Sequence, residues 1–130
     1  MLIRRRGHGV LIDASAWITA MREGGDESVR ARVAFLTERG TAAWCAPIRL
    51  ELWPGAKGRK ESEYLRDLME LVADLEITAA VWNQAIELAV LARRSGLNCP
   101  YPDFLVVACS RIHRVELLHC DKHFDLLAKL

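Results

Sequence analysis

The sequence predicts an α/β sandwich built around a mainly parallel β-sheet. Short apolar runs alternate along the chain with longer segments whose apolar residues recur at helical spacing, as expected when strands alternate with helices. The chain has 130 residues, of which 52% are hydrophobic and 27% charged. This length is typical of one core, so we expect residues 1–130 to form a single domain.

The first third of the chain predicts a strand followed by two helices. The run "GVLID" is typical of a short buried strand, and the following "ASAWITAMRE" places Trp17, Ile18 and Met21 at helical spacing before a Gly-Gly pair ends it. A second helix is expected over residues 28–39, with Gly40 as its stop.

The middle of the chain predicts a second strand and two further helical segments. "TAAWCAP" is a strand closed by Pro47, and "IRLELW" is a short helix or turn broken by the "PG" at Pro54 and Gly55. The leucines between Lys60 and Ala73 recur at helical intervals and predict another helix.

The last part of the chain continues the alternation. "DLEIT" predicts a short strand, residues 79–95 form the clearest amphipathic helix, and Gly96 ends it. "YPDFLVVACSRIHR" predicts a helix with Pro102 in its first turn, and "VELLHC" is a strand that leads into a final helix, "DKHFDLLAKL". The chain contains no linker, repeat or low-complexity segment.

The composition limits the classes of function. Eighteen basic and 17 acidic residues give a net charge of +1, so the protein has no overall positive field that would attract nucleic acid. Nucleic acid would have to be bound by local basic groups such as Arg4–Arg6 or Arg93 and Arg94. Such groups are more typical of solvated surfaces. No apolar run reaches the roughly 18 residues that span a membrane, and no signal-peptide core follows the N-terminal arginines. We expect a soluble, cytoplasmic protein.

The four cysteines indicate a reducing compartment. None of them forms a C-x-x-C pair, which argues against a structural zinc site or a redox pair. Three lie among apolar neighbours, in "AAWCAP", "VVACS" and "LLHCD". We therefore expect reduced, mostly buried thiols, and we expect the four tryptophans to belong to the core.

Four acidic residues are candidates for a site, although each has an ordinary structural explanation. Asp13 and Asp121 follow predicted strands and precede helices, where either can be an N-cap. Asp103 lies in a first helical turn, where the helix dipole favours an acid, and Glu51 alone is typical of a solvated surface charge.

Together the four acids predict a metal site. In an α/β fold the ligand site lies beyond the carboxyl ends of the strands, where these side chains can converge. Two unit charges about 4 Å apart repel by roughly 4 kcal/mol at an effective dielectric of 20, and a divalent cation reverses that term. An open, oxygen-only site suits Mg²⁺ or Mn²⁺. Such a site supports hydrolysis of a phosphodiester by metal-activated water.

The ordered motifs "LIDAS", "LELWPG", "PDFLVVACS" and "LLHCDKHF" resemble those of the PIN domain, and their spacing resembles that of VapC-type toxins of toxin–antitoxin pairs. The resemblance implies a three-layer α/β/α sandwich in which Asp13, Glu51, Asp103 and Asp121 bind Mg²⁺ or Mn²⁺ and the Ser15 hydroxyl helps to orient the site. It also implies a homodimeric endoribonuclease acting on tRNA or rRNA, inhibited by a small VapB-like antitoxin that inserts a segment into the active-site groove.

The sequence departs from the family pattern at two positions. Cys120 stands where relatives commonly have Thr or Ser, which puts one polar contact in doubt. His123 stands where many relatives have a further Asp, which puts a second metal position in doubt. Asp125 lies nearby but is typical of a surface residue of the last helix.

Other functions match the sequence less closely. Haloacid-dehalogenase-like phosphatases need a second aspartate two residues after the first, where this chain has Ser15. A metal-free ribonuclease would need a converging pair of histidines, and the spacing of the four histidines indicates none. A catalytically degenerate binding module is disfavoured by the intact acidic set. A housekeeping PIN nuclease without an antitoxin stays open.

Overall fold

The computed structural model describes residues 9–130, so Arg4–Arg6 and His8 lie outside the described residues. Four parallel strands form one sheet in the order β3-β2-β1-β4. The strands are β1 (Val10–Ile12), β2 (Ala42–Cys45), β3 (Ala73–Leu75) and β4 (Glu116–Leu118). The helices are α2 (Ala14–Met21), α3 (Glu27–Glu38), α4 (Ala46–Gly55), α5 (Gly58–Leu68), α6 (Ala79–Arg94), α7 (Tyr101–His113) and α8 (Lys122–Leu127).

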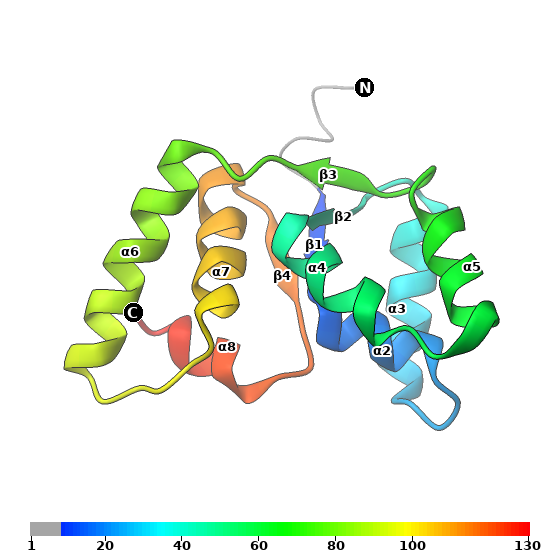
Figure 1. Cartoon of the computed structure of the whole chain (residues 1–130), viewed down its shortest axis with the longest axis horizontal. Coiled ribbons are helices and arrows are strands. Elements are labelled where there is room, and N and C mark those ends of the chain that lie inside the picture. Colours follow the sequence, from blue (N-terminus) through cyan, green and yellow to red (C-terminus); the bar gives the residue numbers. More distant parts are fainter. Residues whose placement is uncertain (1–8) are drawn as a thin grey trace.

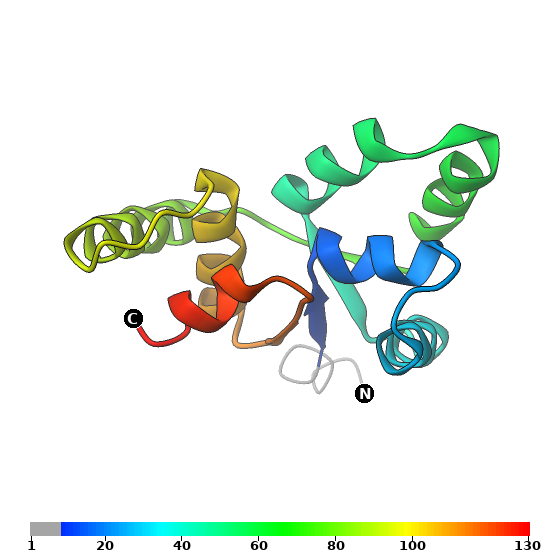
Figure 2. The same ribbon diagram turned by 90° about the horizontal axis from the view of Figure 1, so that it is seen from below.

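The helices cover the sheet on two sides. Helices α6, α7 and α8 lie on one side of β1, and α2, α3 and α5 lie on the other (Figures 1 and 2). Helix α4 contacts both α2 and α7 and so joins the two groups. This arrangement confirms the predicted α/β/α sandwich with a parallel sheet. Over residues 9–130, no helix combines the length and apolar content needed to cross a membrane.

The two central strands are buried along their whole length. Every residue of β1 and β2 is buried, which is expected for parallel strands with helices packed on both faces. All their side chains except that of Ala43 belong to one core cluster that also includes Trp17 from α2, Leu88 from α6 and Phe104 from α7. One continuous core therefore joins the sheet to both helical layers.

The register of β1 and β4 brings their carboxyl ends level. Ile12 pairs with Leu118, and the next amide, Asp13 N–H, donates to the Leu118 carbonyl at 2.9 Å. Residues that directly follow the two strands must therefore meet at the same edge of the sheet. The four strands thus bring Asp13 and the segment before Asp121 together, although they are more than 100 residues apart in the sequence.

Two predicted helix ends are wrong. Helix α4 continues through Pro54 and Gly55 instead of breaking before them, because a proline in the final turn removes only one helical hydrogen bond. Helix α5 ends at Leu68 rather than near Ala73, because the Leu68 carbonyl accepts from two later amides in a turn and Ala73 then begins β3. The other predicted elements are confirmed with small shifts of their ends.

The predicted burial is wrong for some cysteines and tryptophans. Cys45 and Cys109 are buried free thiols, as expected, whereas Cys120 is exposed because it follows the end of β4 at the open edge of the sheet. Trp53 and Trp82 are 38% and 53% exposed, because they lie on the outer surfaces of α4 and α6. Apolar neighbours in the sequence do not determine which side of a helix faces solvent.

An ion pair fastens the end of α2 to α5. Arg22 donates from Nε to Glu61 Oε2 at 2.8 Å and from Nη2 to Glu61 Oε1 at 3.1 Å. The Lys57 amide also donates to Oε1, at 2.7 Å. The hydrogen bond from Arg22, followed by that from Lys57, lowers the pKa of Glu61 from 4.5 to about 2. The carboxylate is therefore held in its charged form by folding.

This pair predicts a defined loss of stability in acid. Because the folded-state pKa of Glu61 lies below the unfolded value of 4.5, its stabilisation is present above that pH and is lost as the pH falls toward about 2. We expect Glu61→Gln to lower the urea midpoint at pH 7 and to match the unmodified protein near pH 2. The control is Glu63→Gln, at an exposed position of the same helix. A midpoint difference that is the same at both pH values would contradict the prediction.

Candidate metal centre

Asp13 is both a helix cap and a buried carboxylate at the sheet edge. It directly follows β1, is only 6% exposed, and is the N-cap of α2. The amide of Ser15 donates to Asp13 Oδ2 at 2.9 Å, and the Ser15 hydroxyl donates to the same oxygen at 2.6 Å. Both of these hydrogen bonds end on Oδ2. The capping role therefore leaves Oδ1 available to a ligand.

Ser15 joins Asp13 to the loop after β4. Its hydroxyl oxygen accepts from the Cys120 amide at 2.9 Å while donating to Asp13. The Thr19 hydroxyl contacts Cys120 Sγ at 3.7 Å and also donates to the Ser15 carbonyl at 2.9 Å. At position 120 the backbone amide thus makes the polar link, and the thiol adds only a weak one. Ser15 therefore fixes the orientation of the Asp13 carboxylate through two hydrogen bonds to Oδ2.

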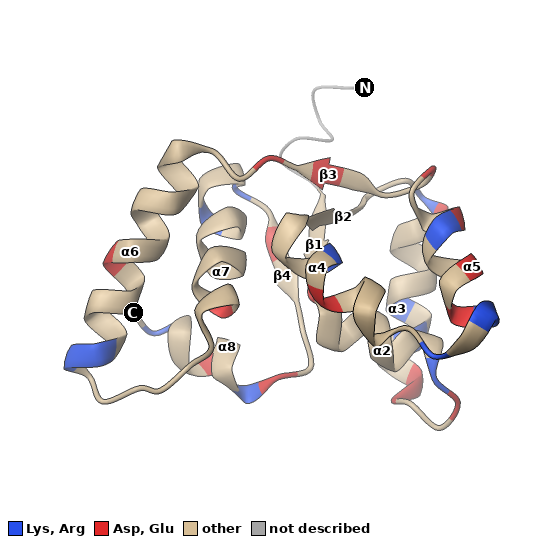
Figure 3. Ribbon diagram, viewed as in Figure 1, with Lys and Arg blue, Asp and Glu red and all other residues tan. Residues whose placement is uncertain are grey.

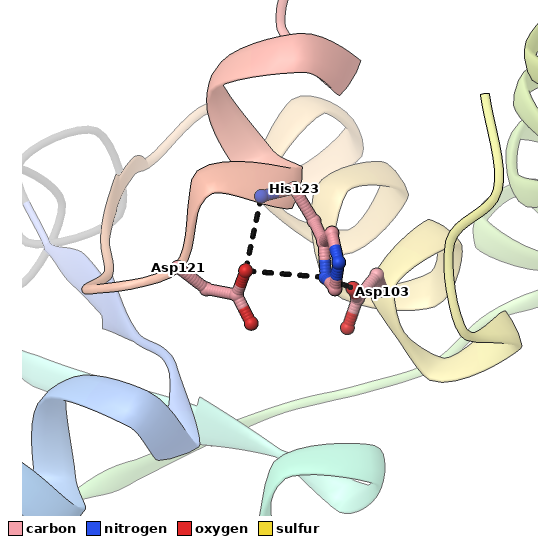
Figure 4. Close-up of side chains that lie close together, drawn as sticks. All are labelled: Asp103, Asp121 and His123. Atoms are coloured by element: carbon pink, nitrogen blue, oxygen red, sulfur yellow. Dashed lines mark hydrogen bonds and ion pairs between the residues drawn. The ribbon is translucent and has the colours of Figure 1, made fainter.

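Asp121 is the N-cap of α8 and also faces the site. Its Oδ1 accepts from the His123 amide at 3.0 Å and lies 3.1 Å from His123 Nδ1 (Figure 4). The backbone amide of Asp121 donates to His119 Nδ1 at 3.3 Å. Hydrogen bonds therefore join Asp121 both to the residues before it and to the first turn of α8. Like Asp13, this acid caps a helix and is also a predicted site residue.

Asp103 lies in the first turn of α7 and points toward Asp121 (Figure 4). Its Oδ2 lies 3.1 Å from His123 Nδ1. Burial and the negative charge of Asp13 raise the pKa of Asp103 above its ordinary value, although the contact with His123 works in the opposite direction. Asp103 is thus a partly buried acid whose charge is disfavoured by another acid.

Glu51 extends the acidic group from α4. The residue is exposed, and Figure 3 shows acidic positions on α4, on α7 and around the start of α8. Partial burial, and then the charges of Asp13, Asp103 and Asp121, raise the pKa of Glu51. The four predicted site residues therefore share one region of negative potential, in which the other three acids disfavour the charge of Glu51.

This arrangement fits a divalent cation. Asp103, Asp121 and His123 each offer a ligand atom, and these atoms all lie within 4.8 Å of one another. Asp13 and Glu51 lie outside that tight group but close enough to act on it electrostatically. Carboxylate oxygens are ligands that Mg²⁺ and Mn²⁺ prefer. Added positive charge would relieve the repulsion that raises the pKa values of Glu51 and Asp103.

Sequence reasoning missed the place of His123 and of Cys99. The imidazole of His123 lies between two of the acids. Two signals could have found it: its position where the family pattern has a further Asp, and its place two residues after a helix cap. Burial and the charges of Asp103 and Asp121 raise the pKa of the Cys99 thiol, which places it near the same acids. Asp125 is exposed on α8, as predicted.

The raised pKa of Glu51 predicts a stability gain on its removal. Because the folded-state pKa lies above the unfolded one, ionised Glu51 destabilises the protein at pH 7, and this cost disappears below the unfolded value of 4.5. We expect Glu51→Gln to raise the melting temperature of the metal-free protein at pH 7. The gain in the free energy of unfolding should be less than about 1 kcal/mol, because solvent screens an exposed group. At pH 4 the gain should vanish. The control is the exposed Glu87→Gln on α6, and a lower melting temperature at pH 7 would contradict the prediction.

The comparisons with known proteins agree with this geometry. The model of the PIN domain family matches residues 10–130. Ribonuclease VapC11 of Mycobacterium tuberculosis is 29% identical over 124 residues, covering 93% of this chain and 92% of the relative. Ribonuclease VapC51 of the same organism is 36% identical over 104 residues, covering 78% of this chain and 74% of the relative.

Solved structures share the fold at low sequence identity. VapBC2 from Rickettsia felis, bound to a DNA fragment from its promoter, has a TM-score of 0.77 at 16% identity and covers 93% of this chain and 94% of that one. VapC20 of Mycobacterium tuberculosis, a toxin that cleaves the sarcin–ricin loop, has a TM-score of 0.68 at 18% identity and covers 91% of this chain and 94% of that one. The parallel sheet, the acids at its edge and the match over residues 10–130 lead to one conclusion: this chain belongs to the PIN domain family, in its VapC-type branch.

Proposed function

We propose that this protein is a Mg²⁺- or Mn²⁺-dependent endoribonuclease, the toxin of a type II toxin–antitoxin pair, with residues 1–130 as a single domain. The observation that carries the proposal is the convergence of Glu51, Asp103 and Asp121 on the strand-end carboxylate Asp13. Burial, and then the charges of the neighbouring acids, raise the pKa values of Glu51 and Asp103. Such mutual repulsion is costly unless a cation is bound. The names of the VapC relatives support ribonuclease activity.

Each site residue has a role in this proposal. Asp13 and Asp103 are the principal metal ligands, and Glu51 and Asp121 complete the site or position a water. A bound ion would lower the pKa of a water molecule and stabilise negative charge on the phosphate oxygens. Ser15 holds Asp13 Oδ2 with two hydrogen bonds and so keeps its carboxylate plane in place. With water attacking the phosphorus in place of the ribose 2′-OH, and the 3′-oxygen leaving and taking up a proton, the products would carry a 5′-phosphate and a 3′-hydroxyl.

The proposed substrate is cellular RNA, either tRNA or rRNA. This rests on the relatives, since the metal chemistry itself does not require a 2′-OH. VapC20, which shares the fold, cleaves the sarcin–ricin loop, an RNA element. Single-stranded loops are the usual targets of sequence-specific RNA recognition, because their bases are unstacked and reachable. The protein would act in the cytoplasm, and its four free cysteines agree with that reducing compartment.

The proposed partners are a VapB-like antitoxin and a second copy of the chain. Solved structures with this fold include VapBC complexes from Rickettsia felis and Salmonella typhimurium. Large apolar side chains are also exposed on α4 and α6, among them Leu50 at 74%, Ile86 at 58% and Trp82 at 53%. Contiguous exposed apolar surface is typical of protein interfaces.

The neighbouring gene would also distinguish the two functions. A short upstream reading frame for a DNA-binding protein would support the toxin role, and its absence would favour a housekeeping nuclease.

The proposal is tested by incubating the pure protein with total RNA and Mn²⁺, with and without EDTA. We expect discrete cleavage products with 5′-phosphate ends in Mn²⁺ and none in EDTA. Adding excess Mn²⁺ back to the EDTA sample should restore cleavage. Cleavage that persists in EDTA, or products with 2′,3′-cyclic phosphate ends, would contradict hydrolysis by metal-activated water.

A further inference from the structure

His123 lies between two acids of the proposed metal centre. Its Nδ1 lies 3.1 Å from Asp103 Oδ2 and 3.1 Å from Asp121 Oδ1, so one ring nitrogen faces both carboxylates (Figure 4). Asp103 lies in the first turn of α7, Asp121 is the N-cap of α8, and His123 lies in the first turn of α8. Within residues 9–130 this trio is the one group of three or more His, Cys, Asp or Glu side chains whose possible ligand atoms all lie within 4.8 Å of one another.

The spacing of these atoms suits ligands that share one ion. Two ligands at right angles on an ion, each about 2.1 Å from it, lie about 3 Å apart. Both nitrogen-to-oxygen distances in the trio are 3.1 Å, so a shared ion would need little movement of the side chains. Without an ion, an Nδ1–H group can donate to the carboxylates across the same distance. The same geometry therefore serves the protein with and without metal.

The backbone holds the imidazole in place independently of an ion. Asp121 Oδ1 accepts from the His123 amide at 3.0 Å as the cap of α8, which ties the histidine to its neighbouring ligand. Phe124, the next residue, is 2% exposed in the core and anchors the first turn of α8. The position of the ring thus follows from the capped helix, not from the site alone.

We propose that His123 Nδ1 is a ligand of the metal, so that this chain binds its ion through a mixed set of nitrogen and oxygen atoms. This inference rests on the proposed function, which needs a divalent ion at these acids. Carboxylates alone favour Mg²⁺ and Mn²⁺, whereas an imidazole nitrogen favours later transition ions such as Co²⁺. His123 therefore shifts the preference of the site away from Mg²⁺. The nitrogen that ligates must offer its lone pair, so the ring proton then lies on Nε2.

The direct test is pulsed electron paramagnetic resonance of Mn²⁺ bound to the pure protein, without RNA. We expect hyperfine coupling of Mn²⁺ to a ligand nitrogen in the unmodified protein and its loss in His123→Asn. The matched control is His113→Asn, because His113 lies ten residues beyond Asp103 on the same helix, about 15 Å along its axis. A bound Mn²⁺ without nitrogen coupling, or coupling that persists in His123→Asn, would overturn the proposal.

A second measurement compares the affinities for Co²⁺ and Mg²⁺ by titration calorimetry. In His123→Asp the site has only oxygen ligands, and we expect the preference for Co²⁺ over Mg²⁺ to fall by about tenfold or more. An unchanged preference in folded protein, checked by circular dichroism, would overturn the proposal. The ligand role of His123 and the proposed ribonuclease function can be disproved separately. Mn²⁺-dependent RNA cleavage without nitrogen coupling would overturn only the role of His123. Nitrogen coupling without RNA cleavage would overturn only the proposed function.

Discussion

Replacing Asp13 by Asn is expected to lower Mn²⁺-dependent RNA cleavage by at least about 100-fold. Mutating a residue that only supports a metal ligand typically costs up to about 100-fold, and the loss of a direct ligand should cost at least as much. The substitution removes the charge that faces the site and keeps the side-chain shape. Asn is as good an N-cap as Asp, so the amide of Ser15 keeps an acceptor and α2 keeps its start. Cleavage of labelled RNA at fixed Mn²⁺, together with the melting temperature, measures the two effects separately.

The chain offers a closely matched control for this substitution. Asp26 caps α3 as Asp13 caps α2: Ser28 donates its amide to Asp26 Oδ1 at 2.8 Å and its hydroxyl to the same oxygen at 2.6 Å. Asp26 lies beyond the far end of α2, away from the site. We expect Asp26→Asn to leave RNA cleavage unchanged. Equal activity of Asp13→Asn and the unmodified protein would refute the role of Asp13.

The largest expected effect on stability comes from Trp44→Ala. Trp44 is 2% exposed on the central strand β2 and contacts two other aromatic rings, with its centroid 5.7 Å from that of Trp17 and 5.5 Å from that of Trp53. Removing a buried tryptophan leaves a cavity that costs about 3–5 kcal/mol. Since domains of this size are stable by only about 5–15 kcal/mol, we expect a large shift of the urea midpoint.

Trp82→Ala provides the comparison at an exposed site. This side chain is 53% exposed on α6, so its loss should change the free energy of unfolding by less than about 1 kcal/mol. Both variants remove the same number of atoms, and therefore the difference between them measures burial. A loss below about 1 kcal/mol for Trp44→Ala would mean that β2 does not form the centre of the core.

The structural and functional explanations of the strand-end acids turn out to be compatible. Asp13 and Asp121 are both N-caps, which the local sequence suggests by itself. A carboxylate has two oxygens, and in Asp13 both capping hydrogen bonds end on one of them. Capping thus fixes the side chain in an orientation that leaves the other oxygen for a ligand. A cap and a candidate ligand can therefore be the same residue.

The alternation of strands and helices was predictable because it depends on local spacing. Strand β1 and the amphipathic helix α6 are where the apolar pattern places them. Burial on a given face was less predictable: Cys120 and Trp82 have apolar neighbours in sequence and are nonetheless exposed. Which face of a helix is covered depends on elements that are distant in sequence, and a local pattern carries no information about them.

The sequence by itself determined the fold class and the residue types of the site, because the period of apolar residues and the cap positions of Asp13 and Asp121 are local properties. Only the tertiary structure decided which atoms meet. The parallel register of β1 with β4 brings Asp13 to the loop that holds Asp121, and the packing of α8 beside α7 places His123 between two acids. These contacts join residues 20 to more than 100 positions apart, and their distances follow from how the core packs.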